Sequence, residues 1–290
     1  MEINLFNKEI QVKDYDCSYN KDIFNPRPPI FNLYIQITDA CNAKCNFCDK
    51  PGCKDNNFDY DKFKYVFEEL YNKQLIKFVS ITGGEPFLNI EKLCKVIDII
   101  HRTDPNFPIG VNTNGYNLNI INDLDIVELH ISRHHYDDNK NQNVFNVAVP
   151  ILEQIQSKIE TVHTEVVFNC VLQKGLIDNL DEMKTYLDKV SLTGIRRVQF
   201  ISMMPLTEYY DDNYVDPTPI IAGLSNTIND GYLYDKNICE CFNLMYISSS
   251  GIPVEVSIKN NKQHLCSYTR QFVYNTNNNL IAGFGGQIII

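Results

Sequence analysis

Six short apolar runs alternate with amphipathic segments along most of this chain, and this alternation restricts the fold more than any other feature. Short runs rich in Val, Ile and aromatic residues are typical of strands, whereas apolar residues spaced three and four apart indicate helices. Helical spacing is clearest in residues 59–74 and 179–190. Their apolar faces are Phe63, Val66, Phe67 and Leu70, and Leu180, Met183, Tyr186 and Leu187. The expected strands are Asn32–Thr38, Lys77–Thr82, Ile109–Thr113, Ile126–Ser132, Thr164–Leu172 and Arg197–Met204.

A strand, a crossover helix and a second strand produce a parallel sheet, and six such units in succession can curl into a barrel. We therefore predict an α/β fold over residues 31–217, a partial (β/α)6 TIM-like barrel of parallel strands. The alternation stops after Pro205. Beyond it, turn clusters between apolar arms predict two hairpins in a small C-terminal β-rich module, residues 218–290. Residues 1–30 are expected to form an extended lead-in with room for one hairpin.

The chain has 290 residues, a net charge of −10 and a pI near 5.1. This acidic balance disfavours nucleic acid, which proteins hold largely through its phosphate backbone. No basic start followed by an apolar run marks a secretory signal, and no apolar stretch reaches the roughly 20 residues that span a bilayer. We expect a cytoplasmic protein with no membrane partner. In a reducing cytosol the ten cysteines should not form structural disulfides, so some of them need another purpose.

Three cysteines lie close together in the loop CNAKCNFC, which follows the first expected strand. Cysteine thiolates are the usual protein ligands of iron–sulfur clusters, and a short loop can bring three of them to one cluster. A complete cluster or zinc site takes four ligands, and Cys53 is a candidate for the fourth. Without it, Cys41, Cys45 and Cys48 leave one iron open, and an open coordination position is where chemistry takes place.

The loop resembles the signature of the radical S-adenosylmethionine (SAM) superfamily, including an aromatic residue, Phe47, just before the third cysteine. Other segments at the ends of the following strands carry the same resemblance. They are ITGGEP at residues 81–86, NTNG at 112–115, ISRHH at 131–135 and FNCVLQKG at 168–175. Together with the loop they span residues 32–205, which is most of the chain.

The resemblance implies that Cys41, Cys45 and Cys48 hold a [4Fe-4S] cluster whose open iron chelates the amino and carboxylate groups of SAM. One electron, from a flavodoxin- or ferredoxin-like donor, then cleaves SAM to methionine and a 5′-deoxyadenosyl radical, which abstracts hydrogen from a substrate. Backbone carbonyls around Gly83 and Gly84 would accept hydrogen bonds from the methionine ammonium group. The other residues that the resemblance assigns to the cofactor are Phe47, Glu85, Asn112, Asn114, Ser132, Arg133 and Asn169.

Several of these residues have a second interpretation. Glu85 either orients SAM or caps the helix that follows it. Arg133 either binds the SAM carboxylate through its planar fork or forms a salt bridge at the rim. Asn169 either binds SAM or is a buried, hydrogen-bonded asparagine. Like Glu85 and Arg133, His134 and His135 are candidate catalytic residues that contact substrate or move a proton; their alternative is a place in a surface loop.

A second group of cysteines, Cys239, Cys241 and Cys266, falls in the C-terminal region. Its setting near a hairpin with a glycine turn resembles the auxiliary-cluster modules called SPASM and twitch, which implies a second iron–sulfur cluster. The alternatives are a Cys3His zinc site completed by His264, and simple packing. Outside this group, Cys94 and Cys170 lie in apolar patterns and are expected to be buried.

Three functions are open on the sequence alone. The first is an enzyme that modifies a ribosomally made peptide, which is favoured because an acidic protein suits a basic leader and exposed hairpin edges can pair with a strand. The second is an enzyme of small-molecule rearrangement or cofactor biosynthesis that acts on a nucleotide or sugar. The third is an iron–sulfur protein that binds without catalysis, which the complete cysteine loop together with GGEP disfavours.

Overall fold

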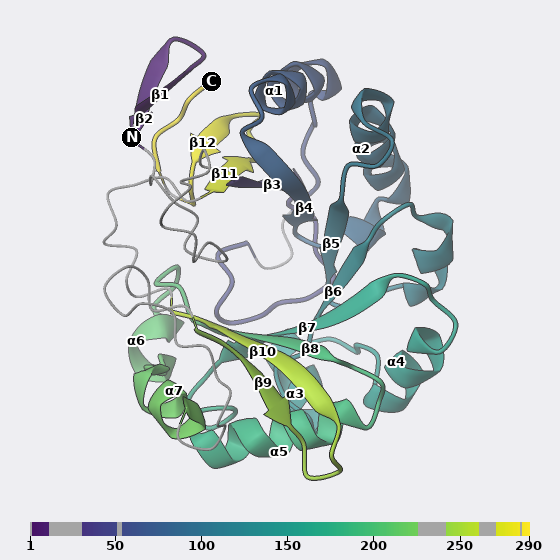
Figure 1. Cartoon of the computed structure of the whole chain (residues 1–290), viewed down its shortest axis with the longest axis vertical. Coiled ribbons are helices and arrows are strands. Elements are labelled where there is room, and N and C mark those ends of the chain that lie inside the picture. Colours follow the sequence, from purple (N-terminus) through teal and green to yellow (C-terminus); the bar gives the residue numbers. More distant parts are fainter. Residues whose placement is uncertain (1, 12–30, 51–53, 226–241, 261–270, 285) are drawn as a thin grey trace, which may run out of the picture.

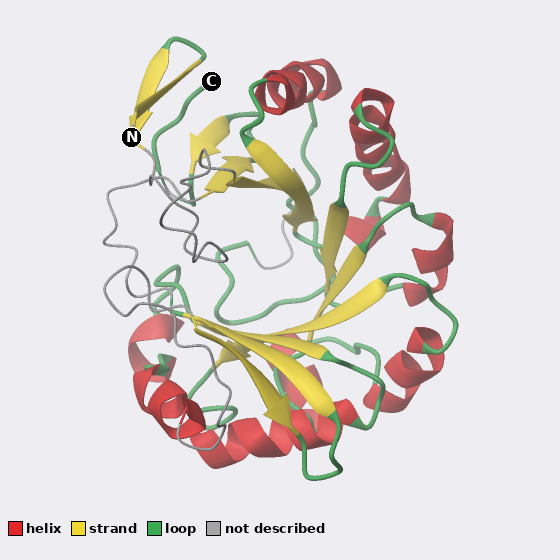
Figure 2. Ribbon diagram, viewed as in Figure 1, coloured by secondary structure: helices red, strands yellow, loops and turns green. Residues whose placement is uncertain are grey.

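A computed structural model describes residues 2–11, 31–50, 54–225, 242–260, 271–284 and 286–290. Within these residues the main element is a ten-stranded sheet that curves around a common interior, with helices on its outside (Figures 1 and 2). The central strands are β3 (Phe31–Thr38), β4 (Ile76–Gly83), β5 (Ile109–Thr113), β6 (Glu128–Ser132), β7 (Glu165–Leu172) and β8 (Arg197–Ser202).

The helices lie between these strands and after the last of them. They are α1 (Tyr60–Asn72), α2 (Ile90–Thr103), α3 (Asp138–Phe145), α4 (Leu152–Ile159), α5 (Leu180–Ser191), α6 (Tyr209–Asn213) and α7 (Thr218–Ser225), with short 3-10 helices η1 (Pro86–Leu88) and η2 (Leu118–Asp123). Among the described residues, no helix combines the length and the apolar character that crossing a membrane requires.

All six predicted strands are present, and each is parallel to the next along the chain. β6 begins and β8 ends two residues inside the predicted limits. The N–H groups of Ile126 and Leu206 donate instead to Leu124 and Met204, at 3.1 and 2.8 Å, in tight turns that cannot continue a strand. The predicted α/β fold with a partial TIM-like barrel is confirmed.

The two predicted C-terminal hairpins are also present, but they belong to the barrel sheet. They consist of β9 (Phe242–Ile247) with β10 (Pro253–Lys259), and β11 (Gln271–Tyr274) with β12 (Leu280–Ala282). β10 pairs in parallel with β8, and β11 pairs in parallel with β3 (Figure 1). The hairpins thus extend both sides of the six-stranded core, and a module boundary at residue 218 stays a prediction.

The hairpin expected in the lead-in is formed by β1 (Glu2–Leu5) and β2 (Lys8–Gln11). In its turn, the Phe6 ring packs edge-on against Tyr65 of α1, with 5.5 Å between ring centroids. The Lys8 ammonium donates to the carbonyl of Ile288 at 2.9 Å. The hairpin is thereby joined to the outer helices and to the C-terminal segment.

The two faces of the curved sheet differ in chemistry. The outer face is apolar and fully buried beneath the helices, as Leu33, Val111 and Phe168 illustrate. The inner face alternates with it along each strand, and the strand register places its side chains side by side. Its polar members include Gln36, Asn112, Ser132, Asn169, Gln199 and Ser257. The outer face therefore supplies the hydrophobic core, and the inner face is left for polar contacts.

Candidate active site

The candidate site lies at the edge where β3, β4, β5 and β6 end. In a parallel barrel the carboxyl ends of the strands meet at the same rim, where ligands are bound. The cysteine loop follows β3, GGEP begins at the end of β4, NTNG overlaps the end of β5, and Ser132 ends β6. The structure brings these four predicted segments together.

The cysteine loop is a tight turn that leaves its three thiols half-buried. The N–H of Cys48 donates to the carbonyl of Cys45 at 3.1 Å. Between the first two cysteines, Ala43 is buried against Phe145 and Val149, and the side chains of Cys41 and Cys45 touch this small apolar cluster. The loop is therefore supported from below by α3 and the segment that follows it.

The three thiols lie close enough to interact electrostatically, although no three His, Cys, Asp or Glu side chains in the described ranges converge on one metal-ion position. Burial, together with the charges of Cys48 and Cys41, raises the pKa of Cys45 to about 12. A thiol in this setting gives up its proton when a cation compensates the charge, as the irons of a cluster do. These properties fit a cluster in which separate irons receive the three thiolates.

The two glycines of GGEP allow the end of β4 to pack against the start of the cysteine loop. Gly83 has a φ of +131°, a backbone conformation that residues other than glycine rarely adopt. A Cβ at Gly84 would lie 2.1 Å from the carbonyl oxygen of Ala40. The N–H of Gly84 donates to the carbonyl of Thr38 at 2.6 Å. The backbone conformation at Gly83 and the close approach of Gly84 to Ala40 therefore require glycine at these two positions. The contacts of their carbonyls with SAM stay a prediction.

Glu85 is buried and joins the ends of β4 and β5. One carboxylate oxygen accepts from the Thr113 hydroxyl at 2.7 Å and from the N–H of Phe87 at 3.0 Å. The other accepts from the N–H of Asn114 at 2.7 Å. The bond to Phe87 caps η1, so the capping interpretation of Glu85 is confirmed, while its contact with SAM stays a prediction.

Burial raises the pKa of Glu85 to about 7, from an ordinary value of 4.5, and this predicts a pH-dependent stability. Between these values the folded state binds more protons than the unfolded state, so the free energy of unfolding should fall by about 3 kcal/mol as pH rises through them. Urea unfolding at about pH 5 and about pH 7.5 measures the fall, which should be smaller in Glu85→Gln. Equal falls in both proteins would contradict the prediction.

The side chains of the two asparagines of NTNG donate hydrogen bonds to different parts of the site. The amide of Asn112 donates to the Ser80 hydroxyl at 2.8 Å, on the inner face of the sheet. The amide of Asn114 donates to the side-chain oxygen of Asn42 at 2.7 Å, which ties the end of β5 to the cysteine loop. Asn42 was not predicted, because nothing in the sequence separates it from the other polar residues of the loop.

Asn169 lies on the inner face of β7, paired with Ser132 at the end of β6. Its amide donates to the side-chain oxygen of Asn112 at 3.2 Å. Its own Oδ1 is buried and has no hydrogen-bond partner among the described residues. A buried acceptor is costly unless something donates to it, and a cofactor with hydroxyl or amine groups would do so. This acceptor fits the predicted SAM contact of Asn169, and the SAM contact of Ser132 stays a prediction.

Arg133 is buried and forms an ion pair with a partly exposed partner, Asp138. Its guanidinium contacts the carboxylate of Asp138 and donates to the carbonyls of Pro150 and Tyr136, at 3.1 and 3.4 Å. The side chain is only 1% exposed. The alternative interpretation of Arg133, a salt bridge, is therefore correct, but the partner is Asp138 at the start of α3 and the Arg133 side chain is buried rather than exposed at the rim. The predicted contact with the SAM carboxylate is weakened, because this guanidinium is already neutralised.

His134 packs against the cysteine loop. Its ring lies between Phe47 and Phe145, with ring centroids 5.1 and 4.9 Å away. Nδ1 accepts from the N–H of Val171 at 3.1 Å, so the neutral ring carries its proton on Nε2. Burial, with a smaller effect of Arg133, lowers the pKa of His134 to about 3. His134 is therefore neutral at physiological pH, and its alternative placement in a surface loop is wrong because α3 and the cysteine loop cover it.

His135 is also buried rather than at the surface. Its Nδ1 accepts from the N–H of Asp137 at 2.8 Å, and within the described residues its Nε2 has no hydrogen-bond partner. Burial lowers its pKa, so this ring too favours the neutral form. Substrate contact or proton transfer by either histidine stays a prediction.

Two supporting residues were not predicted from the sequence: Asp138, which pairs with Arg133, and Phe145, which covers His134. Both belong to α3, whose N-cap Asp137 accepts from the N–H of Lys140 at 2.9 Å. An aspartate before a polar segment is a signal for a helix start, and it could have located α3. The helix was missed because it has few apolar residues, which leaves no helical period.

The remaining cysteine predictions have different outcomes. Cys170 is buried as expected, whereas the expectation for Cys94 is wrong. Cys94 is exposed because the buried face of α2 is formed by its neighbours Leu93 and Val96. The second-cluster residues and their alternatives lie outside the described residues, so that cluster, the zinc site and the fourth ligand stay predictions: Cys53, Cys239, Cys241, His264 and Cys266.

Proteins with similar sequences include a GTP 3′,8-cyclase from Staphylococcus epidermidis, which is 31% identical over 166 residues, 52% of this chain and 48% of that protein. A GTP 3′,8-cyclase from Haemophilus ducreyi is 24% identical over 275 residues, 81% of this chain and 76% of that protein. The chain spans about half the length of the first of these curated relatives, and a similar share of one from Aquifex aeolicus.

Solved structures show the same fold. Streptococcus suis SuiB bound to S-adenosylmethionine superposes with a TM-score of 0.65 at 14% identity, over 88% of this chain and 60% of that chain. The family model described as the radical SAM superfamily matches residues 35–190, more than half of the chain, including the cysteine loop, GGEP and NTNG. The chain therefore belongs to the radical SAM superfamily, a family of iron–sulfur enzymes.

Proposed function

We propose that this protein reductively cleaves SAM and uses the resulting radical to abstract hydrogen from a substrate. The observation that carries the proposal is the cysteine loop itself. Its three half-buried thiols interact with one another at the barrel rim, and the start of the loop packs against the GGEP turn, which the family places at the methionine end of SAM. In this reading Cys41, Cys45 and Cys48 ligate a [4Fe-4S] cluster.

A cluster held by these thiolates would supply the electron that cleaves SAM reductively, which would generate the radical that abstracts hydrogen from the substrate. The protein's own groups then have distinct tasks. Carbonyls near Gly83 and Gly84 would accept from the SAM ammonium group, and the Oδ1 of Asn169, which has no partner in the described part of the chain, would accept from a hydroxyl or amine of the cofactor. Phe47, fixed by His134, provides an aromatic surface beside the third cysteine. A flavodoxin- or ferredoxin-like protein would supply the electron.

A peptide is the substrate that the inner face supports best. That face carries amide and hydroxyl side chains, which pair well with the N–H and C=O groups of a peptide backbone. Its cation Arg197 begins β8, at the end of the barrel opposite the candidate site, and is bound there by Glu128 and Glu165 at 2.8 and 2.9 Å, so it is not placed to bind a substrate phosphate at the rim.

A nucleotide is the second candidate substrate, and the relatives named GTP 3′,8-cyclase are the observation that favours it. With such a substrate, the chain would carry out a rearrangement in cofactor biosynthesis. The two candidates differ in what must stimulate SAM cleavage, so one assay separates them.

The test uses the full chain, purified without oxygen, reconstituted with iron and sulfide, and reduced with dithionite. We expect 5′-deoxyadenosine and methionine to form in equal amounts, measured by liquid chromatography and mass spectrometry. Absence of 5′-deoxyadenosine from cluster-loaded protein would overturn the proposed function. Faster cleavage with short basic precursor-type peptides would support the peptide assignment, and faster cleavage with GTP alone would replace it with the nucleotide.

A further inference from the structure

The entry and the exit of the cysteine loop are joined at the base of the loop. Lys50, two residues after Cys48, places its ammonium 2.6 Å from a carboxylate oxygen of Asp39, two residues before Cys41. The N–H of Asp39 donates to the side-chain oxygen of Asn56 at 3.2 Å. The loop is therefore closed by side chains of its own flanking segments.

The turn between β11 and β12 holds this closure from one side. The Lys50 ammonium donates to the hydroxyl of Thr276 at 3.1 Å, and the Asn56 amide donates to the Thr276 carbonyl at 2.9 Å. Thr276 is buried, with 4% of its surface exposed. One residue of the C-terminal hairpin thus bonds to the exit of the cysteine loop at two points.

A second residue of the same turn adds two more bonds. The N–H of Asp59 donates to the side-chain oxygen of Asn278 at 2.8 Å, and the Asn278 amide donates to the carbonyl of Asn57 at 2.9 Å. Asn278 has a φ of +60°, a conformation that asparagine tolerates better than most residues. The turn is therefore shaped to face residues 56–59.

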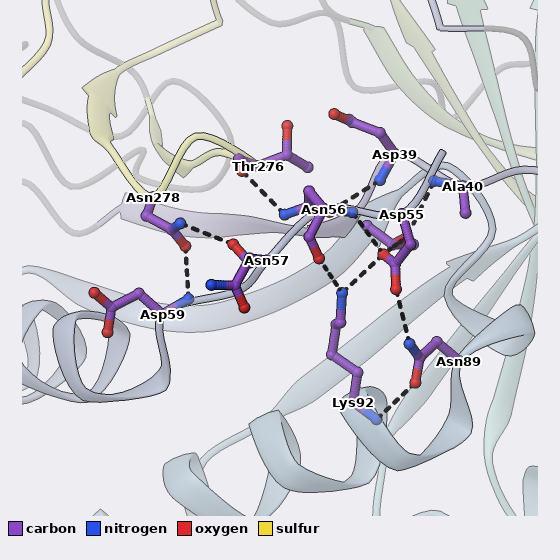
Figure 3. Close-up of polar contacts among 11 residues, drawn as sticks. Asp39, Ala40, Asp55, Asn56, Asn57, Asp59, Asn89, Lys92, Thr276 and Asn278 are labelled. Atoms are coloured by element: carbon purple, nitrogen blue, oxygen red, sulfur yellow. Dashed lines mark hydrogen bonds and ion pairs between the residues drawn. The ribbon is translucent and has the colours of Figure 1, made fainter. Parts of the chain in front are cut away.

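The opposite side of the same segment is held by the start of α2, as Figure 3 shows. The buried ammonium of Lys92 donates to Asp55 at 2.8 Å and to the carbonyl of Asn56 at 2.9 Å. Asn89 donates to the other carboxylate oxygen of Asp55 at 3.0 Å. Residues 55–59 are therefore held on both sides, by the β11–β12 turn and by the start of α2, and they form a fixed support for the end of the cysteine loop.

We propose that Thr276 is a positioning residue for the cysteine loop, and that through Lys50 it sets where the third thiol meets the cluster. Lys50 is only two positions from Cys48 in the sequence, and a chain of that length spans at most about 7 Å. A displacement of Lys50 is therefore passed on to Cys48. This inference rests on the proposed function, because it concerns the cluster that the function requires.

The experiment measures how fast reconstituted protein loses iron to a chelator under anaerobic conditions. Thr276→Val keeps the shape of the side chain and removes the hydroxyl acceptor, and it should release iron roughly tenfold faster, as expected for loss of a hydrogen bond to a charged group. Thr276→Ser keeps the hydroxyl and should restore the wild-type rate. Thr193→Val is the matched control, because Thr193 is similarly buried and its hydroxyl donates to a nearby carbonyl in the sequence, that of Val190, at 2.7 Å.

A double-variant cycle tests the route through Lys50. Lys50→Met should also release iron faster, and adding Thr276→Val to it should bring little further change, because the shared bond is already lost. A full tenfold increase in that background would contradict the proposal, as would wild-type release from Thr276→Val alone. If the wild-type protein holds no cluster, the proposed function fails instead, so the two failures are distinguishable.

Discussion

Replacing Cys41, Cys45 and Cys48 together with Ala should abolish formation of 5′-deoxyadenosine and lower bound iron by about four atoms per chain. The cause is the loss of all three thiolates that the loop offers to the cluster. The protein should remain folded, because the loop is anchored by Ala43 and by Lys50 rather than by the half-buried thiols. Anaerobic activity assays and iron analysis measure both effects, and circular dichroism reports the fold.

Cys94→Ala is the matched control, since Cys94 is exposed on α2, and it should keep wild-type iron and activity. SAM cleavage that persists in the triple variant would contradict the assignment of the loop. The metal that remains in the triple variant also tests the second site. About four irons would support a cluster at Cys239, Cys241 and Cys266, whereas one zinc would support the site with His264.

Arg133→Ala should lower the free energy of unfolding by about 2 to 5 kcal/mol, which is the usual cost of truncating a large, fully buried side chain. The variant loses the contact with Asp138 and the bonds to the carbonyls of Pro150 and Tyr136. It also leaves a cavity where a fully buried side chain stood. Urea unfolding followed by circular dichroism measures the change.

Arg102→Ala provides the comparison, because Arg102 pairs with Asp98 at 2.7 Å but is 77% exposed. Its stability should change by less than about 1 kcal/mol, as for other surface pairs. Unchanged stability together with weaker SAM binding in Arg133→Ala would instead support a role for Arg133 in binding the cofactor. If Arg133→Ala unfolded at the wild-type urea concentration and bound SAM roughly ten- to a hundredfold more weakly, the SAM carboxylate would be its partner after all.

The barrel could be predicted because its signals are local. Each strand carries its own apolar run, and the buried faces of α1 and α5 follow helical spacing, so the α/β order needs no knowledge of distant contacts. The placement of the C-terminal hairpins could not be predicted in the same way. The pairing of β11 with β3 joins residues far apart in the sequence, and the residues of neither strand indicate which strand it pairs with.

The candidate site shows a similar division. Spacing alone identified the cysteine loop, and strand order then placed GGEP, NTNG and Ser132 at the same rim. The spacing of residues in the sequence cannot predict which partner the end group of a long side chain contacts. Arg133 follows a strand at the rim, but its guanidinium reaches Asp138 rather than the open site, because a helix start without an apolar period supplies the nearer carboxylate. Glu85 is likewise buried by the fold around it.

The bond between Lys50 and Thr276 joins residues that are 226 positions apart, and this separation has a consequence for biosynthesis. At a translation rate of about 5 to 20 residues per second, the cysteine loop emerges from the ribosome roughly ten to forty-five seconds before the turn that holds it. During that interval its thiols are present without their final support. Iron–sulfur insertion should therefore follow completion of the last hairpin, and ribosome-bound chains stalled before residue 276 should retain a cluster less well than released ones.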